Sequence, residues 1–383
     1  MRLLALAGQA DSLIADIRLR TPLQRLCDQT GASLQIQSLH DCGPADLAAA
    51  DVLIVQRGLS PRCWRLQRAM RRRGGAVVYE IDDLLTEVPV HISNHAAIQA
   101  AQPWLRRCLA ESDLVTVSTA RLGQALAVPA VAVVPNCAWP DRDLPLPQAV
   151  AGQPVHLLFA SMESLAADFI VPALRALQSL PPPGVRLVAV GPAAASLAAS
   201  GLAVQAQPLM PRERFIDFVR SLPNAVAVIP LEDSRFAACK SAVKWFEYAN
   251  AGVPVLCSAV SPYAEVVQGG VTGELVLNDP GAWQAALQRA VADPAWRGRV
   301  AAAAQQQVRR HHTLQGMVDA WRRALDQALQ QRLRAVLPAP GSAEWLQGVW
   351  WRMTDAPLRR LRQINRARLG RRQSRGQARG PAR

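Results

Sequence analysis

The chain contains only two lysines, Lys240 and Lys244, although it has 43 basic residues in all. The two lie four residues apart, so on a helix both ammonium groups would project from one face. Lysine carries a compact point charge and arginine a wide planar fork, and a tight anionic site can require the smaller group. The spacing therefore predicts an anion-binding pair. The alternative is a solvated helix face on which two lysines stand by chance.

A carboxylate, Glu247, follows on the same helical stripe. The expected helix comes after a buried strand at 225–230, and the free N–H groups and dipole of a helix amino terminus favour an anion. Two ammonium groups beside that terminus suit a group with more than one negative charge, such as a diphosphate. Glu247 could then accept two hydrogen bonds from a vicinal diol such as a ribose. The alternative is an ion pair between Glu247 and Lys244, worth about a few tenths of a kcal/mol.

Two adjacent carboxylates, Asp82 and Asp83, stand at the carboxyl end of an expected strand at 76–81. Their position favours activation of a hydroxyl group or orientation of an acceptor, and the alternative is a helix N-cap. They are the one carboxylate pair that suggests Mg²⁺, but the chain offers no convincing metal cluster and we expect no metal. His91 and His95 follow as candidates for contact with a sugar or an acceptor, although a single histidine is more often structural.

Apolar runs alternate with helical stretches along most of the chain, which predicts an open, mostly parallel α/β sheet. The pattern is completed once before residue 135 and restarts at residue 155. The expected strands are 3–7, 33–39, 51–56, 76–81, 113–118, 131–134, 155–160, 185–190, 225–230 and 255–257. This repetition predicts two doubly wound, Rossmann-like α/β domains that face each other across a cleft. Ligands of such sheets bind at the carboxyl ends of the strands.

A stretch rich in proline and charge separates the two units and sets the expected domain boundaries. We assign residues 1–140 to the first domain, 141–154 to a linker and 155–330 to the second domain. Residues 331–383 form an expected basic, arginine- and tryptophan-rich helical tail. The boundaries place both lysines in the second domain and both aspartates in the first.

The composition favours a cytoplasmic location. No apolar run approaches the roughly 20 residues that span a bilayer, and the apolar start at 1–7 is too short for a signal peptide. Seven scattered cysteines without a CxxC pair favour a reducing compartment and argue against a disulfide framework or a zinc site.

The tail carries most of the net charge of +14, because residues 331–383 hold 13 arginines and two acidic residues. Trp345, Trp350 and Trp351 precede the arginine-rich stretch 359–369. Aromatic residues beside a basic amphipathic helix suit an anionic membrane surface, which we expect over residues 345–372. A solvated tail is an equal alternative, and nucleic-acid binding is the interpretation we favour least.

The lysine segment resembles a known family. The run from Lys240 through Lys244 and Glu247 to Gly252-Val253-Pro254 looks like the donor-binding half of GT-B glycosyltransferases, of the retaining kind called family 4 or group 1. The resemblance extends over about residues 50–326, and the other segments that carry it are 263–267, 270–276, 112–119 and 134–136.

The resemblance implies a nucleotide-sugar donor bound mainly by the second domain and an acceptor bound mainly by the first. Glu247 matches the second glutamate of the family's E-x7-E motif, which holds the donor ribose, whereas the first glutamate falls at Cys239. The arginine and lysine that usually neutralise the diphosphate are absent from residues 159–164, so Lys240 and Lys244 are the expected substitutes. The other donor-binding residues expected here are Ser161, Gly191, Ser241 and Glu265.

The resulting prediction is transfer of a sugar from a nucleotide donor to a glycan or lipid-linked acceptor in surface polysaccharide assembly. Lys240, Lys244 and Asp83 are the expected catalytic residues. The resemblance implies retention of configuration, and we expect neither a metal nor another cofactor. Two alternatives stay open: a catalytically degenerate GT-B binding or scaffold subunit, and a GT-B nucleotide-sugar epimerase.

Overall fold

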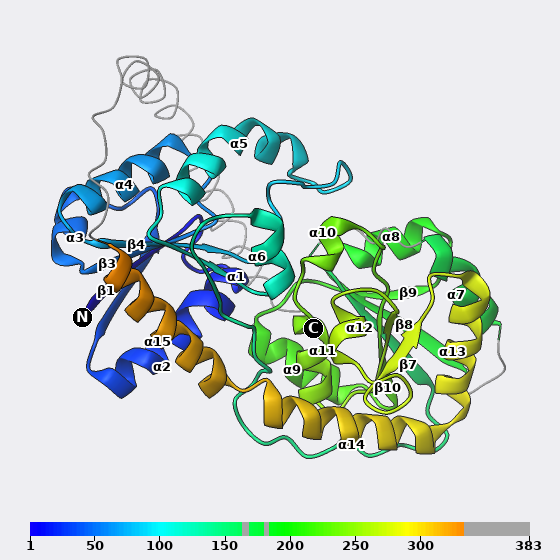
Figure 1. Cartoon of the computed structure of the whole chain (residues 1–383). Coiled ribbons are helices and arrows are strands. Elements are labelled where there is room, and N and C mark those ends of the chain that lie inside the picture. Colours follow the sequence, from blue (N-terminus) through cyan, green and yellow to red (C-terminus); the bar gives the residue numbers. More distant parts are fainter. Residues whose placement is uncertain (163–167, 180–183, 333–383) are drawn as a thin grey trace, which may run out of the picture. The chain divides into compact units, whose positions relative to one another are not determined.

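The computed structural model describes residues 1–162, 168–179 and 184–332, and shows two parallel sheets of six strands each (Figure 1). The first sheet has the order β2-β1-β3-β4-β5-β6. Its strands are β1 (Arg2–Ala7), β2 (Ser33–Ser38), β3 (Val52–Gln56), β4 (Ala76–Ile81), β5 (Leu114–Val117) and β6 (Val131–Val133). All neighbouring pairs are parallel.

The second sheet has the order β12-β11-β10-β7-β8-β9, again with parallel neighbours throughout. Its strands are β7 (Val155–Ala160), β8 (Val185–Val190), β9 (Val204–Gln207), β10 (Ala225–Ile229), β11 (Val255–Ser258) and β12 (Glu274–Val276). In each sheet the strand order reverses direction beside the first strand, between β1 and β3 in the first sheet and between β7 and β10 in the second. This is the doubly wound topology that the sequence predicts.

Helices connect the strands and cover the sheets. Those of the first half are α1 (Leu13–Ala15), the π-helical η1 (Asp16–Arg20), α2 (Thr21–Thr30), α3 (Pro44–Ala49), α4 (Pro61–Arg72), α5 (His95–Ala110) and α6 (Ala120–Leu126). The later ones are η2 (Asp168–Ile170), α7 (Val171–Gln178), α8 (Ala193–Ala199), α9 (Arg212–Ser221), α10 (Arg235–Ala238), α11 (Val243–Asn250), α12 (Tyr263–Val266), α13 (Pro280–Ala292), α14 (Pro294–His311) and α15 (Leu314–Gln331). No helix within the described ranges is long and apolar enough to cross a bilayer.

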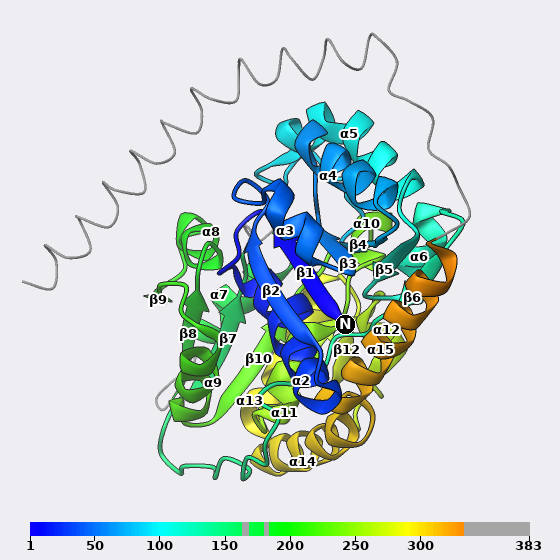
Figure 2. The same cartoon turned by 90° about the vertical axis from the view of Figure 1, so that its left-hand side faces the viewer.

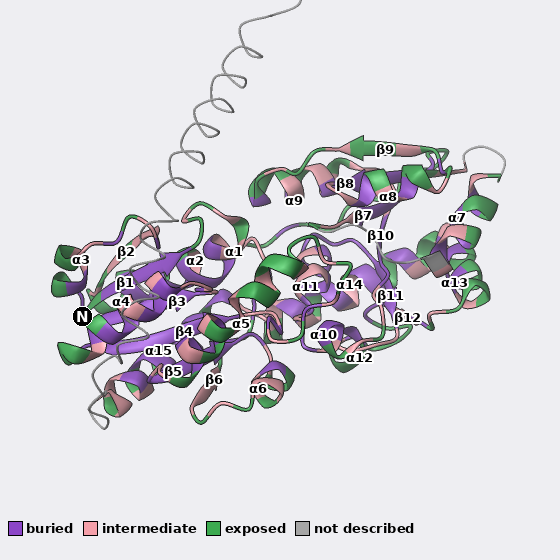
Figure 3. Ribbon diagram, turned by 90° about the horizontal axis from the view of Figure 1, so that it is seen from above, coloured by how far each residue is buried: buried purple, intermediate pink, exposed green. Residues whose placement is uncertain are grey.

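The central strands are buried on both faces, as parallel strands under helices must be. All five residues of β3 and all six of β4 are buried, and Figure 3 shows the same for the middle of each sheet. Four apolar clusters result, two for each sheet. Because the strands themselves are buried, we expect the polar site residues in the loops that follow their carboxyl ends.

The last described helix, α15, returns to the first sheet (Figures 1 and 2). Leu314, Trp321 and Ala328 are buried in the same apolar cluster as Leu3 of β1 and Ile54 of β3. The domain boundaries expected from the sequence stay predictions, but this packing places the segment 314–328 with the first half rather than with residues 155–330. The expected basic tail lies outside the described residues from 333 onward.

A buried polar network lies beneath the loops of the first sheet. Arg18 is fully buried, and its Nε donates to Glu80 at 2.7 Å while its Nη1 donates to Asn136 at 2.8 Å. The indole N–H of Trp321 donates to the Arg18 carbonyl at 3.1 Å. Burial raises the pKa of Glu80 against the opposing effect of Arg18. The network thus ties α15 to the loop that follows β6.

Truncation of Trp321 tests the docking of α15. We expect Trp321→Ala to lower the free energy of unfolding by about 3–5 kcal/mol, because a fully buried indole is replaced by a cavity. Trp321→Phe keeps much of the volume and should cost less. Urea unfolding measures both, and Arg323→Ala on the exposed face of the same helix should change it by less than about 0.5 kcal/mol. Equal effects of Trp321→Ala and Arg323→Ala would contradict this packing.

Candidate functional site

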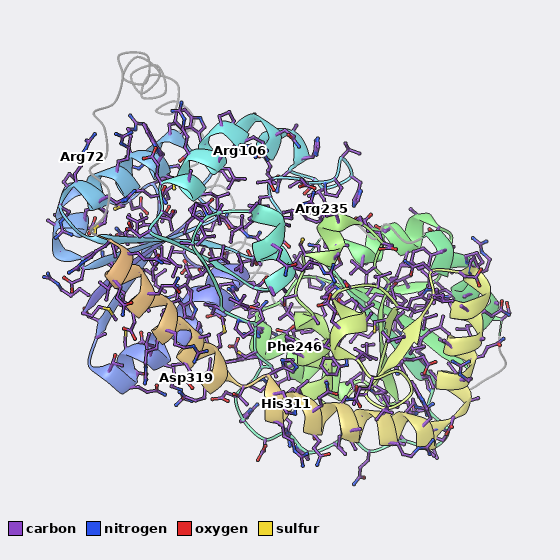
Figure 4. All side chains as sticks on the ribbon, in the orientation of Figure 1. Arg72, Arg106, Arg235, Phe246, His311 and Asp319 are labelled. Atoms are coloured by element: carbon purple, nitrogen blue, oxygen red, sulfur yellow. The ribbon has the colours of Figure 1, made fainter. Side chains whose placement is uncertain are left out.

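The two lysines do not lie on one continuous helix, which corrects the sequence prediction. Helix α10 ends at Ala238, Lys240 lies in the following turn, and α11 begins at Val243 with Lys244 in its first turn. Figure 4 labels Arg235 at the start of α10 and Phe246 on α11, on either side of this break.

Two hydrogen bonds from the first half account for the break. The carbonyl of Cys239, which a continuous helix would pair with the amide four residues later, accepts from the Thr119 hydroxyl at 3.0 Å. The Ser241 hydroxyl accepts from the Asn136 side-chain amide at 2.7 Å. Ser241, expected to bind the donor, is therefore connected through Asn136 to the buried Arg18 network.

Lys240 is paired within the protein. Its ammonium group lies 3.1 Å from Oδ1 of Asp83 and 4.5 Å from the centre of the Phe236 ring. The side chain is 34% exposed, so solvent or a ligand can still reach it. The structure thus brings together Lys240 and Asp83, which come from different halves of the chain. Both were predicted from the sequence to act in the same reaction.

Lys244 has neither a hydrogen bond nor a salt bridge to any residue that the structure describes, although its side chain is partly buried. Burial and then the charge of Lys240 lower the pKa of Lys244 to about 8, against the opposing effect of Glu247. The contribution of Lys240 shows that the two ammonium groups lie close enough to repel each other. An anion bound there would relieve both effects.

Glu247 pairs with Arg212 rather than with Lys244. Nε of Arg212 donates to Oε1 of Glu247 at 2.7 Å, and the two side chains are 3% and 14% exposed. This contact replaces the intrahelical ion pair that was the alternative from the sequence. Arg212, the first residue of α9, was not identified because nothing distinguishes it in sequence from the other arginines. The ribose contact of Glu247 stays a prediction.

Asp82 and Asp83 do not cap a helix but bind a common cation. Arg57, which follows β3, pairs through Nε with Asp82 and through Nη2 with Asp83, the latter at 2.6 Å. Burial disfavours ionisation of Asp83, but Lys240 and Arg57 outweigh this and lower its pKa. Arg57 has a φ of 46°, a backbone conformation that is costly outside glycine. In the sequence, Arg57 is distinguished only by its position directly after a buried strand. This position is the one signal that could have identified Arg57 as a site residue.

The two histidines occupy different positions relative to the predicted site. Nε2 of His91 lies 3.7 Å from Oε2 of Glu232, which follows β10 in the second half. Nδ1 of His95 lies 2.8 Å from the carbonyl of Val88, so this ring holds the loop before α5. His91 therefore reaches the loops after the second sheet, whereas His95 makes a local contact.

Ser161 and Gly191 follow the adjacent strands β7 and β8. The Ser161 amide donates to the carbonyl of Val190 at 3.2 Å, and Gly191 has a φ of 76°. A Cβ atom at Gly191 would lie 2.6 Å from both the Ser161 carbonyl oxygen and the Leu209 side chain. Only glycine fits there, so the two loops approach each other closely at the carboxyl ends of their strands.

Glu265, the expected loop glutamate, is exposed and bound to the first half. Its Oε1 accepts from Nη2 of Arg121 at 2.7 Å and from the Ser261 hydroxyl at 2.7 Å. Ser261 and Arg121 outweigh burial and lower the pKa of Glu265. Within the described ranges, no group of three or more His, Cys, Asp or Glu side chains gathers that could hold a metal ion.

Two sequence comparisons show similarity to glycosyltransferases. Residues 172–323 match the family described as glycosyl transferase-like. A D-inositol 3-phosphate glycosyltransferase of Nocardiopsis dassonvillei is 33% identical over 127 residues, which make up 33% of this chain and 26% of that protein. The chain thus spans about a quarter of the length of this curated relative.

Solved structures with low sequence identity share the fold. A sucrose-phosphate synthase from Thermosynechococcus elongatus is 15% identical, with a TM-score of 0.62 over 86% of this chain and 100% of that chain. Anabaena HepE in complex with UDP and glucose is 15% identical, with a TM-score of 0.55 over 85% and 99% of the respective chains. These likenesses confirm the expected GT-B architecture.

Removal of Lys244 should stabilise the folded chain near neutral pH. Because its pKa falls from 10.5 to about 8 on folding, the unfolded chain binds more protons between these values. The stability of the wild type therefore rises across that window, and the charged lysine costs stability below it. We expect Lys244→Met to raise the free energy of unfolding at pH 7 by roughly 1–3 kcal/mol, and the difference to shrink by pH 10.5.

Denaturant unfolding at pH 7 and at the upper end of the window measures this difference. Lys240→Met is the matched control, and it should bring no stabilisation because Lys240 has a carboxylate partner in Asp83. A Lys244→Met variant that is less stable than the wild type at pH 7 would show that the ammonium group has a compensating partner.

Proposed function

We propose that the chain is a GT-B glycosyltransferase of the group 1 kind, which transfers a sugar from a nucleoside diphosphate donor to a glycan or lipid-linked acceptor. The match of residues 172–323 to the glycosyl transferase-like family and the shared GT-B architecture support this proposal. The observation that carries this proposal is the ammonium group of Lys244, which lies near that of Lys240 and forms no ion pair with any described residue. The two follow β10, at the edge of the sheet where doubly wound folds bind their ligands.

The lysine pair is suited to a departing diphosphate. As the bond to the sugar breaks, negative charge grows on the leaving phosphate while the sugar becomes oxocarbenium-like. Fixed positive charge stabilises such a transition state most when it is already in place, because nothing then has to reorganise. Lys240, Lys244 and the amino terminus of α11 supply that charge, and we propose transfer without a metal ion.

Asp83 has the acceptor-side role in this proposal. Arg57 and Lys240 keep its carboxylate ionised, and it lies 3.1 Å from a lysine assigned to the donor. A hydroxyl bound by Asp83 would therefore stand next to the diphosphate end of the donor. The carboxylate of Asp82 is also bound by Arg57, and Asp82 therefore supports Asp83 indirectly.

The relatives support the substrate classes. HepE has been crystallised with UDP-glucose, and WaaB, a lipopolysaccharide outer core galactosyltransferase of 11% identity, has a TM-score of 0.54. We propose a nucleotide-sugar donor, an acceptor in surface polysaccharide assembly and retention of configuration. Cytoplasmic location and contact of residues 345–372 with an anionic membrane surface remain proposals of the same kind, and those residues lie outside the described part.

Hydrolysis of nucleotide sugars in the absence of an acceptor tests the reaction class. We expect slow release of nucleoside diphosphate from one member of a panel of UDP-, GDP- and ADP-sugars, unaffected by EDTA, and loss of this release in Lys244→Ala. A folded protein whose melting temperature responds to no nucleoside diphosphate in the panel would contradict the donor site. Binding without turnover for any donor and acceptor pair would instead support a binding subunit.

Replacement of Asp83 tests the acceptor role. Asp83→Asn should lower kcat for transfer by about a hundredfold or more, within the range of general acid–base effects, with a small change in donor binding. Asp82→Asn is the matched control and should retain most activity. The measurement is initial-rate kinetics with the donor found by the hydrolysis screen. A Asp83→Asn variant with wild-type kcat would remove Asp83 from the mechanism.

A further inference from the structure

Arg212 is held on two sides. Its Nε donates to Glu247 at 2.7 Å, and its guanidinium carbon lies 4.9 Å from the centre of the Trp139 ring. Arg212 is only 5% exposed, so its positive charge is stabilised by these neighbours rather than by water. An arginine fixed in this way also fixes the carboxylate that it binds.

On each partner of the ion pair, one polar side-chain atom makes no hydrogen bond to the described residues. Arginine and glutamate often pair through two parallel hydrogen bonds, but here one N–H meets one oxygen. Nη2 of Arg212 is buried and has no hydrogen-bond partner among the described residues. Oε2 of Glu247 accepts no hydrogen bond from the part of the chain that the structure describes. The contact therefore orients the Glu247 carboxylate and leaves it able to accept further hydrogen bonds.

The position of Glu247 relative to Lys244 on α11 indicates which group of a ligand the carboxylate could bind. Lys244 and Glu247 lie three residues apart on α11, a rise of about 4.5 Å along the axis. A nucleoside diphosphate has its ribose directly next to its phosphates. A single helix thus carries a cation for the phosphate and a carboxylate for the adjacent diol.

We propose that Arg212 is a positioning residue that makes the donor site selective for ribonucleotides over 2′-deoxyribonucleotides. The inference rests on the proposed function, because it requires Glu247 to meet the donor ribose. The last torsion of a glutamate side chain is broad, so a free carboxylate would sample many orientations. Arg212 holds Oε1 and restricts the carboxylate to orientations in which the remaining oxygen is available to the sugar hydroxyl groups.

Calorimetric titration with the ribo and 2′-deoxyribo forms of UDP, GDP and ADP tests the inference. The wild type should bind the ribo form of its preferred nucleotide about tenfold more tightly or better, as a hydrogen bond to a charged group implies. Arg212→Leu should reduce this ratio to about threefold or less while affinity for the deoxy form changes little. Arg212→Lys, which keeps a charged donor, should give an intermediate ratio.

Two further variants separate positioning from general damage. Glu247→Gln should also reduce the ratio, and the Arg212→Leu/Glu247→Gln double variant should show no additional loss, because both changes act through one carboxylate. Arg214→Leu, an exposed arginine two residues along the same helix, should keep the wild-type ratio. If Arg212→Leu does not fold, Arg212→Lys and Glu247→Gln still report the ratio.

The outcomes distinguish the inference from the function on which it rests. A wild-type ratio in Arg212→Lys and in Arg212→Leu, or equal weakening of both nucleotide forms, would overturn the role of Arg212 and leave the donor site intact. A wild type that binds no nucleotide of the panel would overturn the donor site itself, and the inference with it.

Discussion

The central physical constraint of this site is a positive charge, that of Lys244, kept in a partly buried position without a salt bridge to any described residue. Lys244 loses part of its hydration, and no acidic group among the described residues lies within salt-bridge distance of its ammonium group. The neighbouring cations, in contrast, each form an ion pair with a carboxylate. Lys240 is bound by Asp83, Arg57 by both aspartates, and Arg212 by Glu247. Among these four described cations, Lys244 alone has no carboxylate in salt-bridge contact, and its position after β10 makes it available to an anion.

The surrounding contacts explain how this charge is held in place. Thr119 and Asn136, from the loops of the first sheet, bind Cys239 and Ser241 and so interrupt the helix between the lysines. Asn136 is in turn bound by the buried Arg18, whose carbonyl receives the indole N–H of Trp321. The segment that carries the lysines is thus connected by hydrogen bonds to the core of the other half. Such connections restrict the positions that the ammonium groups can occupy before a ligand arrives, which is what electrostatic stabilisation requires.

The strands and the location of the lysines could be predicted from the sequence, and the contacts between distant segments could not. Buried runs such as Val52–Gln56 predict parallel strands because every residue is apolar or nearly so. The short β9 and β12 lack such runs and were not predicted. The break at Ser241 depends on hydrogen bonds to residues more than a hundred positions away, which no local pattern records. Arg212 does not stand out among the 41 arginines, and Arg57 does so only by its position after a buried strand, since only the fold brings the two to their carboxylates.

The scarcity of lysine makes the central claim directly measurable. Labelling of lysine with ¹³C at the ε-carbon gives signals only from Lys240 and Lys244, and NMR can follow the titration of each. We expect one signal to titrate near pH 8 in the free protein, in line with the pKa of Lys244. We expect this pKa to rise when the preferred nucleoside diphosphate is added, because the bound anion favours the charged lysine. Two signals that titrate at the ordinary value of lysine, with no response to any nucleoside diphosphate, would contradict it.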